Sequence, residues 1–269
     1  MWIFAGGGSV GGLLKQTQLH ADAQNLKMGV ICNDQIFVIP QAYFSVINEH
    51  KKPLNLESSS MAQLVDPWST INQSSVTKLN PRDSKVTLAD GKELSYKALV
   101  LAPGLDSKVE NVEGLKEMDE GPESNNTFVH NLDSKDRVVR NFYNGFDAKG
   151  KDLICYSPAY PYKGEGTDFY ALYYESYLRQ DKMLGLAPEG SRVQYITPNK
   201  TIVPFPYANE VILDECHKRG LEVHLGWEML SVQADDHGNK TMTLRNVDTG
   251  EVVEKDYTGA TINPTSKPH

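Results

Sequence analysis

The start of the chain predicts an α/β fold of the Rossmann type, on three observations. Residues 2–5 form a short apolar run, residues 6–12 are rich in glycine, and residues 13–26 are compatible with a helix. Residues 28–32 then have the composition of a second buried strand. This order of strand, glycine turn, helix and strand is the βαβ unit of a dinucleotide-binding domain.

The glycine turn matches the spacing G-x-G-x-x-G through Gly6, Gly8 and Gly11, with Ser9 and Gly12 in the same turn. The first glycine allows the tight turn, the second allows the backbone to approach a pyrophosphate, and the third allows close packing of helix and strand. The helix that follows offers unpaired N–H groups to an anion. We therefore expect a phosphate contact here; the alternative is a turn that serves close packing only.

A dinucleotide-binding domain also needs an acidic residue near the end of its second strand, to hold the ribose hydroxyls. That place falls on Ile31 and Cys32, and the nearest acid is Asp34. Asp34 is thus the candidate for the ribose contact. The alternative is an aspartate in a surface loop.

Further along, residues 97–102 form a continuous apolar run, typical of a buried parallel strand. A second α/β pattern follows it. Its expected strands are 152–156, 192–196 and 221–225, its helices 167–180 and 209–219, and its hairpin 227–257. The predicted organisation is a first domain at 1–105, a polar linker at 106–148, a second Rossmann-like domain at 149–262 and a tail at 263–269.

The composition excludes several classes of protein. Of the 269 residues, 39% are hydrophobic and 23% charged, as in ordinary globular domains, and no apolar run reaches the roughly 18 residues of a membrane span. The formal net charge of −8 argues against a nucleic-acid partner. The three widely spaced cysteines and seven scattered histidines predict neither a disulfide framework nor a metal site.

One stretch, 75–104, carries a family resemblance. It contains two short alternating strands, Leu79-Asn80-Pro81, Asp90-Gly91 and the apolar strand that ends in Ala102-Pro103-Gly104. With the glycine turn, this pattern resembles the pyridine nucleotide-disulfide oxidoreductase flavoproteins, most closely the sulfide:quinone oxidoreductases.

The resemblance implies a three-layer FAD-binding-type domain, here incomplete, in which Ala102 and Gly104 lie beside the flavin nucleotide together with the glycine turn. It also implies a location at the mitochondrial inner membrane and other protein subunits as partners. The second redox cysteine, a Gly-Asp motif for FAD and the quinone-side helices of the family would lie beyond residue 269.

The departures from the family bear on activity. The resemblance places one redox cysteine after Lys163, where this chain has Gly164. Glycine cannot form the thiolate that accepts sulfur and passes electrons to flavin. Cys155 lies nearby, but we expect it to be a small buried hydrophobic residue. The loop 160–166, with its proline and tyrosines, does not form a dinucleotide turn, so NAD(P) binding is not expected.

Four tyrosines recur at the spacing of one helix face. They are Tyr170, Tyr173, Tyr174 and Tyr177. This stripe predicts a packed helix face. The alternatives are a contact with another protein, since tyrosine is enriched in interfaces, and stacking on a flavin.

The sequence therefore predicts a sulfide:quinone oxidoreductase-like protein with eroded FAD and redox-cysteine sites. We expect it to be non-catalytic and to serve as an accessory subunit of a mitochondrial membrane complex. The alternative is an active FAD-dependent oxidoreductase that passes electrons from sulfide or another small reductant to quinone. A third hypothesis is a module that holds a nucleotide as a structural ligand. FAD is the cofactor that the resemblance leaves open, and no metal is expected.

Overall fold

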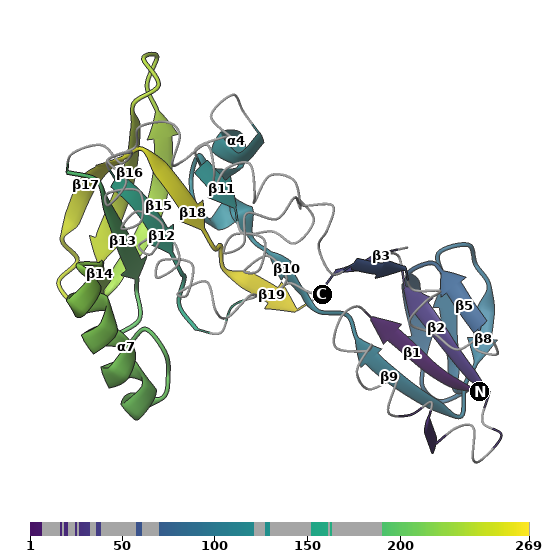
Figure 1. Cartoon of the computed structure of the whole chain (residues 1–269). Coiled ribbons are helices and arrows are strands. Elements are labelled where there is room, and N and C mark those ends of the chain that lie inside the picture. The colour runs from purple at the N-terminus through teal and green to yellow at the C-terminus, as the bar shows by residue number, and fades with distance from the viewer. Residues whose placement is uncertain are drawn as a thin grey trace. The chain divides into compact units, whose positions relative to one another are not determined.

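A computed structural model describes the parts of the chain on which the fold rests. These are residues 1–6, 17, 19–20, 25, 27–32, 36–38, 58–60, 70–120, 127–129, 152–160, 162 and 190–268. They form two compact units, the first up to Leu105 and the second over Asp106–Lys267. Both units contain a parallel sheet, so the predicted α/β, Rossmann-like fold class is confirmed (Figure 1).

The first unit is built on a four-stranded parallel sheet. Its strands, in spatial order, are β5 (Thr70–Gln73), β2 (Met28–Cys32), β1 (Trp2–Gly6) and β9 (Ala98–Ala102). β1 and β2 are neighbours in register, with Ala5 opposite Ile31. All five residues of β2 are buried, as its apolar sequence predicts.

An antiparallel meander packs on this sheet. It comprises β6 (Val76–Asn80), β7 (Lys85–Leu88) and β8 (Glu93–Ser95). Val86 and Leu88 of β7 share a buried cluster with Ile3, Ala5 and Ile31 of the parallel sheet. Two further strands, β3 (Ile36–Val38) and β4 (Ser58–Ser60), pair antiparallel; β4 lies in a stretch without a strand pattern.

The second unit has a five-stranded parallel sheet. Its order is β11 (Thr127–Val129), β18 (Gly259–Ile262), β12 (Asp152–Tyr156), β13 (Arg192–Thr197) and β14 (Glu222–Leu225). The helix α7 (Pro206–Arg219) connects β13 to β14. It begins at Pro206 rather than at residue 209, because proline suits the first helical position. It ends where Gly220 takes a φ of 75°, as the sequence predicts.

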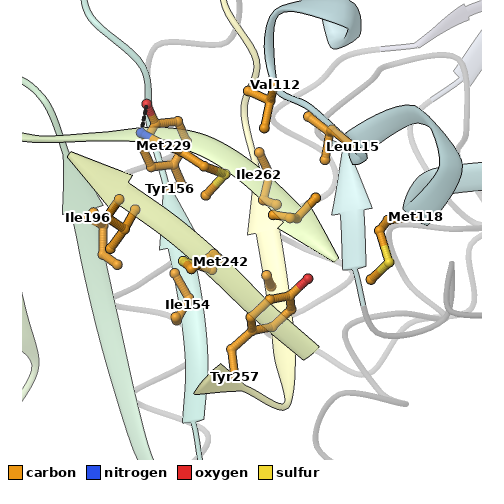
Figure 2. Close-up of a cluster of buried hydrophobic side chains, with 13 residues drawn as sticks. Val112, Leu115, Met118, Ile154, Tyr156, Ile196, Met229, Met242, Tyr257 and Ile262 are labelled. Atoms are coloured by element: carbon orange, nitrogen blue, oxygen red, sulfur yellow. Dashed lines mark hydrogen bonds between the residues drawn. The ribbon is translucent and has the colours of Figure 1, made fainter. Parts of the chain in front are cut away.

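A second meander covers one face of that sheet (Figure 1). It consists of β15 (Trp227–Ala234), β16 (Lys240–Asn246) and β17 (Val252–Tyr257), so the region expected to be a hairpin has three strands. Figure 2 shows the core between the layers, where Ile154, Tyr156 and Ile196 meet Met242 and Tyr257. Strand residues alternate between faces, so Cys155 and Tyr195 are buried on the opposite side of the sheet.

The segment expected to be a polar linker contributes elements to this unit. They are the 3-10 helix η2 (Val109–Asn111), the helix α4 (Leu115–Glu120) and the edge strand β11. Leu115 and Met118 of α4 are buried in the core of Figure 2. Both stand among acidic residues in the sequence, which hides their apolar spacing. Within the expected tail, β19 (Ser266–Pro268) pairs with β10 (Leu105–Ser107).

No helix among the described residues is long and apolar enough to cross a membrane. In the same part of the chain, no three His, Cys, Asp or Glu side chains are grouped as metal ligands would be.

Candidate functional site

The carboxyl edge of the first sheet brings the two glycine signatures together. Gly6 ends β1 and is paired in register with Ala102, which ends β9. Gly104 follows with a φ of +83°, a conformation that side chains rarely adopt, and a Cβ there would meet no atom within 4 Å. In parallel α/β sheets, ligands bind in the crevice outside this edge. The described small residues therefore fit a nucleotide that lies over the ends of β1 and β9.

The ribose side of this edge is different. Ala5 pairs with Ile31, so Cys32 is level with Gly6 at the end of β2, and Cys32 itself pairs with Gln73 of β5. Cys32 is buried and occupies the place where an acid would hold the ribose hydroxyls. Gly8, Ser9, Gly11, Gly12 and Asp34 lie outside the described residues.

The carboxyl edge of the second sheet carries a row of buried polar side chains. Ser157, Thr197 and Asn263 follow or end three neighbouring strands, and each is fully buried. The backbone continues the sheet here, since the Ser157 N–H donates to the Ile196 carbonyl over 3.1 Å and the Asn263 N–H donates to the Tyr156 carbonyl over 2.9 Å. The Ser157 hydroxyl has no hydrogen-bond partner among the described residues.

Asn199 joins the loops after β12 and β13. Its amide nitrogen Nδ2 donates to the Pro158 carbonyl and to Thr197 Oγ1, each over 2.9 Å. Its oxygen Oδ1 accepts the Tyr160 N–H over 3.2 Å. All of these contacts are directed within the protein, so both ends of the Asn199 amide are committed to holding the two loops together.

Two aromatic rings and a helix side chain complete this loop structure. The Tyr160 ring stacks on Tyr162 with centroids 5.1 Å apart, and the Tyr160 hydroxyl donates to the Ile202 carbonyl. The Ile202 N–H donates to Oδ1 of Asn209 in α7 over 2.8 Å. Tyr162 and Asn209 are buried, so the loops are packed as well as hydrogen-bonded.

A dinucleotide site in this position needs free N–H groups after the first strand of the unit, because they bind the pyrophosphate. Here the Ser157 and Tyr160 N–H groups are used by Ile196 and Asn199, and Pro158 and Pro161 have none. The part of the loop that the structure describes thus offers little to a phosphate. Asn199 was not among the candidates from sequence, since a single asparagine in a loop has no pattern that marks it.

All three cysteines of the chain are described, and each is buried and outside any disulfide bond. Cys155 lies within β12 with no exposed surface. Complete burial raises the pKa of its thiol well above the ordinary value, because desolvation disfavours the thiolate. The expectation of a buried small hydrophobic residue agrees with this environment. Gly164 and the tyrosine stripe at 170–177 lie outside the described residues.

No protein-family profile and no curated protein matches this sequence. Solved structures do match it by fold. A chain in the mitochondrial ATP synthase of Tetrahymena thermophila superposes with a TM-score of 0.78 at 20% identity, over 100% of this chain and 64% of that one. The sulfide:quinone oxidoreductase of Aquifex aeolicus gives 0.75 at 16% identity, over 100% and 59%. The NADH-bound NDH2 of Plasmodium falciparum gives 0.73 at 11%, over 100% and 55%.

The chain therefore has the fold of the pyridine nucleotide-disulfide oxidoreductases, and the resemblance predicted from sequence is confirmed at this level. It spans 55 to 64% of the length of the three chains that it matches. At identities of 11 to 20%, the TM-scores of 0.73 to 0.78 establish the common fold alone.

Proposed function

We propose that this chain is a non-catalytic protein with the sulfide:quinone oxidoreductase fold, and that it serves as an accessory subunit of a mitochondrial membrane-associated complex. The observation that carries the proposal is the state of its cysteines. Sulfide oxidation in this fold needs a reactive thiolate pair beside the flavin. The three thiols of this chain are all buried, and burial raises the pKa of Cys155.

The sequence also supports a non-catalytic role, because Gly164 occupies the position where the family has a redox cysteine. The second unit supports it too. Its first loop is tied by Asn199 and Tyr160 at the place where a nicotinamide dinucleotide would lie. We propose that NAD(P) does not bind there.

The first unit retains features that suit a nucleotide phosphate. We propose Gly6, Gly8, Ser9, Gly11 and Gly12 as the phosphate-binding turn, with Ala102 and Gly104 beside it and Asp34 as the candidate ribose contact. A flavin nucleotide held there would be a structural ligand that stabilises the first unit. Its electrons would have no thiol partner within this chain.

The proposed assembly rests on the fold neighbour from Tetrahymena thermophila, which is part of a mitochondrial ATP synthase structure. A chain of this fold can therefore occur within a large respiratory-type assembly. An accessory subunit contributes a folded surface that contacts other subunits, and it needs no redox chemistry. The buried thiols agree with such a role. We propose that the complex is associated with the mitochondrial inner membrane.

The test uses the full chain, tagged and expressed in its own cells. Membranes are solubilised in a mild detergent, and the chain is followed on native gels and by its visible spectrum. We expect it to migrate with an assembly much larger than its own 30.0 kDa and to show no flavin band that sulfide or NADH bleaches. Stoichiometric flavin that either reductant reduces would instead establish the active oxidoreductase.

A further inference from the structure

A second site lies between the parallel sheet and the meander of the second unit. It is a pocket of about 140 Å³ to which five strands contribute. Its lining residues are Ile196, His224, Trp227, Leu244, Val253, Glu254 and Lys255. A cavity of about 150 Å³ with apolar walls can accept benzene, so the pocket is large enough for a small organic molecule.

His224, one of the lining residues, belongs to a hydrogen-bonded set of side chains that fixes its tautomer. Gln194 donates its Nε2 to Asp152 over 3.0 Å, so its oxygen Oε1 is turned toward His224. His224 Nε2 lies 3.0 Å from that oxygen and must be the donor. In neutral His224 the other nitrogen, Nδ1, is therefore an acceptor without a hydrogen.

The charges around His224 come from three strands. Glu222 on β14 lies 3.6 Å from Nε2, and Arg192 on β13 is paired with Glu222 over 3.1 Å. Lys255 on β17 approaches from the meander, and the exposed Glu254 lies beside it at the pocket wall. Burial and Lys255 lower the pKa of His224, and Glu222 opposes this change.

Lys255 is the cation that this pocket leaves available. It is half-buried, and within the described part of the chain no carboxylate forms an ion pair with it. A partly buried ammonium without a counter-ion is a favourable partner for an anion. Trp227, Leu244 and Val253 supply apolar surface beside it, which suits the body of an organic acid.

We propose that this pocket binds a small monocarboxylate, with its carboxylate at Lys255 and its apolar body against Trp227 and Leu244. A carboxylate near His224 also favours the protonated imidazole, whose Nδ1 then becomes a second donor. Binding is therefore accompanied by proton uptake and strengthens as the pH falls. The proposal goes beyond the accessory role and does not depend on it.

The experiment titrates the full chain with benzoate and follows the Trp227 indole and His224 ring signals by NMR. Benzyl alcohol, of similar size and neutral, is the ligand control. We expect saturable shifts with benzoate only, and affinity at least about fivefold lower at pH 8 than at pH 6, the lower end of ordinary coupling between two ligands. Equal binding of benzyl alcohol, or absence of saturable shifts, would overturn the proposal.

Two variants of Lys255 separate charge from structure. Lys255→Gln should weaken benzoate binding about tenfold or more, because a charge-assisted hydrogen bond is lost, whereas Lys255→Arg should retain it. Lys116→Gln, at an exposed position of α4, is the matched control and should bind like the unmodified chain. If Lys255→Gln binds benzoate as well as Lys116→Gln does, the pocket does not recognise the carboxylate.

Discussion

The side-chain amide of Asn199 donates a hydrogen bond to the backbone carbonyl of Pro158 over 2.9 Å and so ties together the loops after two neighbouring strands. The same amide accepts the N–H of Tyr160. In a dinucleotide-binding domain, loop N–H groups in this position face a pyrophosphate. In this protein an internal side chain takes the Tyr160 N–H, so this group is already hydrogen-bonded within the protein.

Replacing Asn199 tests how much the loops depend on it. Asn199→Ala leaves the Pro158 carbonyl and the Tyr160 N–H without this partner, both in partly buried surroundings. We expect a loss of about 2 kcal/mol in the free energy of unfolding, measured by urea denaturation. Gln233→Ala, at an exposed position of β15, should change it by less than about 0.5 kcal/mol. Equal stability of the two variants would show that the loops are held by other contacts.

The cysteines should be inert in the folded protein. All three are buried, and burial raises the pKa of Cys155, so the thiolate needed for reaction is scarce. We expect the native protein not to react with a disulfide reagent at mildly alkaline pH. After denaturation, all three thiols should react.

A cysteine placed on the surface is the control for that measurement. Ala159→Cys, at an exposed position in the loop after β12, should react at once under native conditions. Rapid native labelling of Cys155 would contradict both its burial and the argument that redox chemistry is lost.

Tyr156 should make the stability depend on alkaline pH. Burial raises its pKa to about 12, and its hydroxyl oxygen accepts the Met229 N–H over 3.2 Å (Figure 2). The folded tyrosine keeps its proton at pH values where the unfolded one, with a pKa of about 10, loses it. Stability therefore falls as the pH rises from about 10 toward 12, by at most about 2.7 kcal/mol from this group.

The measurement compares urea unfolding of the unmodified chain and Tyr156→Phe between about pH 8 and pH 11, the range that brackets ordinary tyrosine ionisation. Tyr156→Phe should be about 1 to 3 kcal/mol less stable at pH 8, because the Met229 N–H loses its acceptor, and should show a shallower alkaline decline. Tyr207→Phe, at a side chain 81% exposed, should match the unmodified chain at every pH. Parallel declines for all three proteins would rule out Tyr156 as the cause.

The elements predicted correctly from sequence are those whose signal is local. The strands β1, β2 and β9 are short apolar runs. A glycine ends β1, a proline follows β9, and Gly220 marks the end of α7. β5 was missed because it is an edge strand with an exposed Ile71, so its residues lack the apolar pattern of a buried strand. The place of β11 in the sheet depends on its pairing with β18, in which Thr127 lies opposite Ala260. No local sequence pattern encodes a pairing between residues so far apart in the chain.

The candidate site divides in the same way. The pairing of Gly6 with Ala102 could be anticipated, because both end apolar strands of one predicted sheet. The Asn199 contacts could not, since they depend on how two loops meet after folding. The pocket at His224 and Lys255 combines side chains from five strands, and it exists only once the meander has packed on the sheet.

Gly114 allows the segment before α4 to lie close against β15. Glu113 and Val232 are joined by a backbone hydrogen bond of 2.9 Å, and the Glu113 N–H donates to Leu230 over 3.0 Å. Gly114 has a φ of +76°, and a Cβ there would lie well inside contact distance of the Val232 carbonyl oxygen. We expect Gly114→Ala to cost at least about 3 kcal/mol, from the left-handed backbone and the clash together.

Gly91→Ala separates these two causes. Gly91 has a similar φ of +82°, but a Cβ there meets no atom within 4 Å, so only the backbone term of about 1 to 2 kcal/mol applies. Urea denaturation of both variants measures the difference, which is the cost of moving residues 113–118 away from β15. Since Leu115 and Met118 are part of the core in Figure 2, that movement should also loosen the meander, seen as faster amide hydrogen exchange in β15. Equal losses in the two variants would mean that this segment yields without disturbing the core.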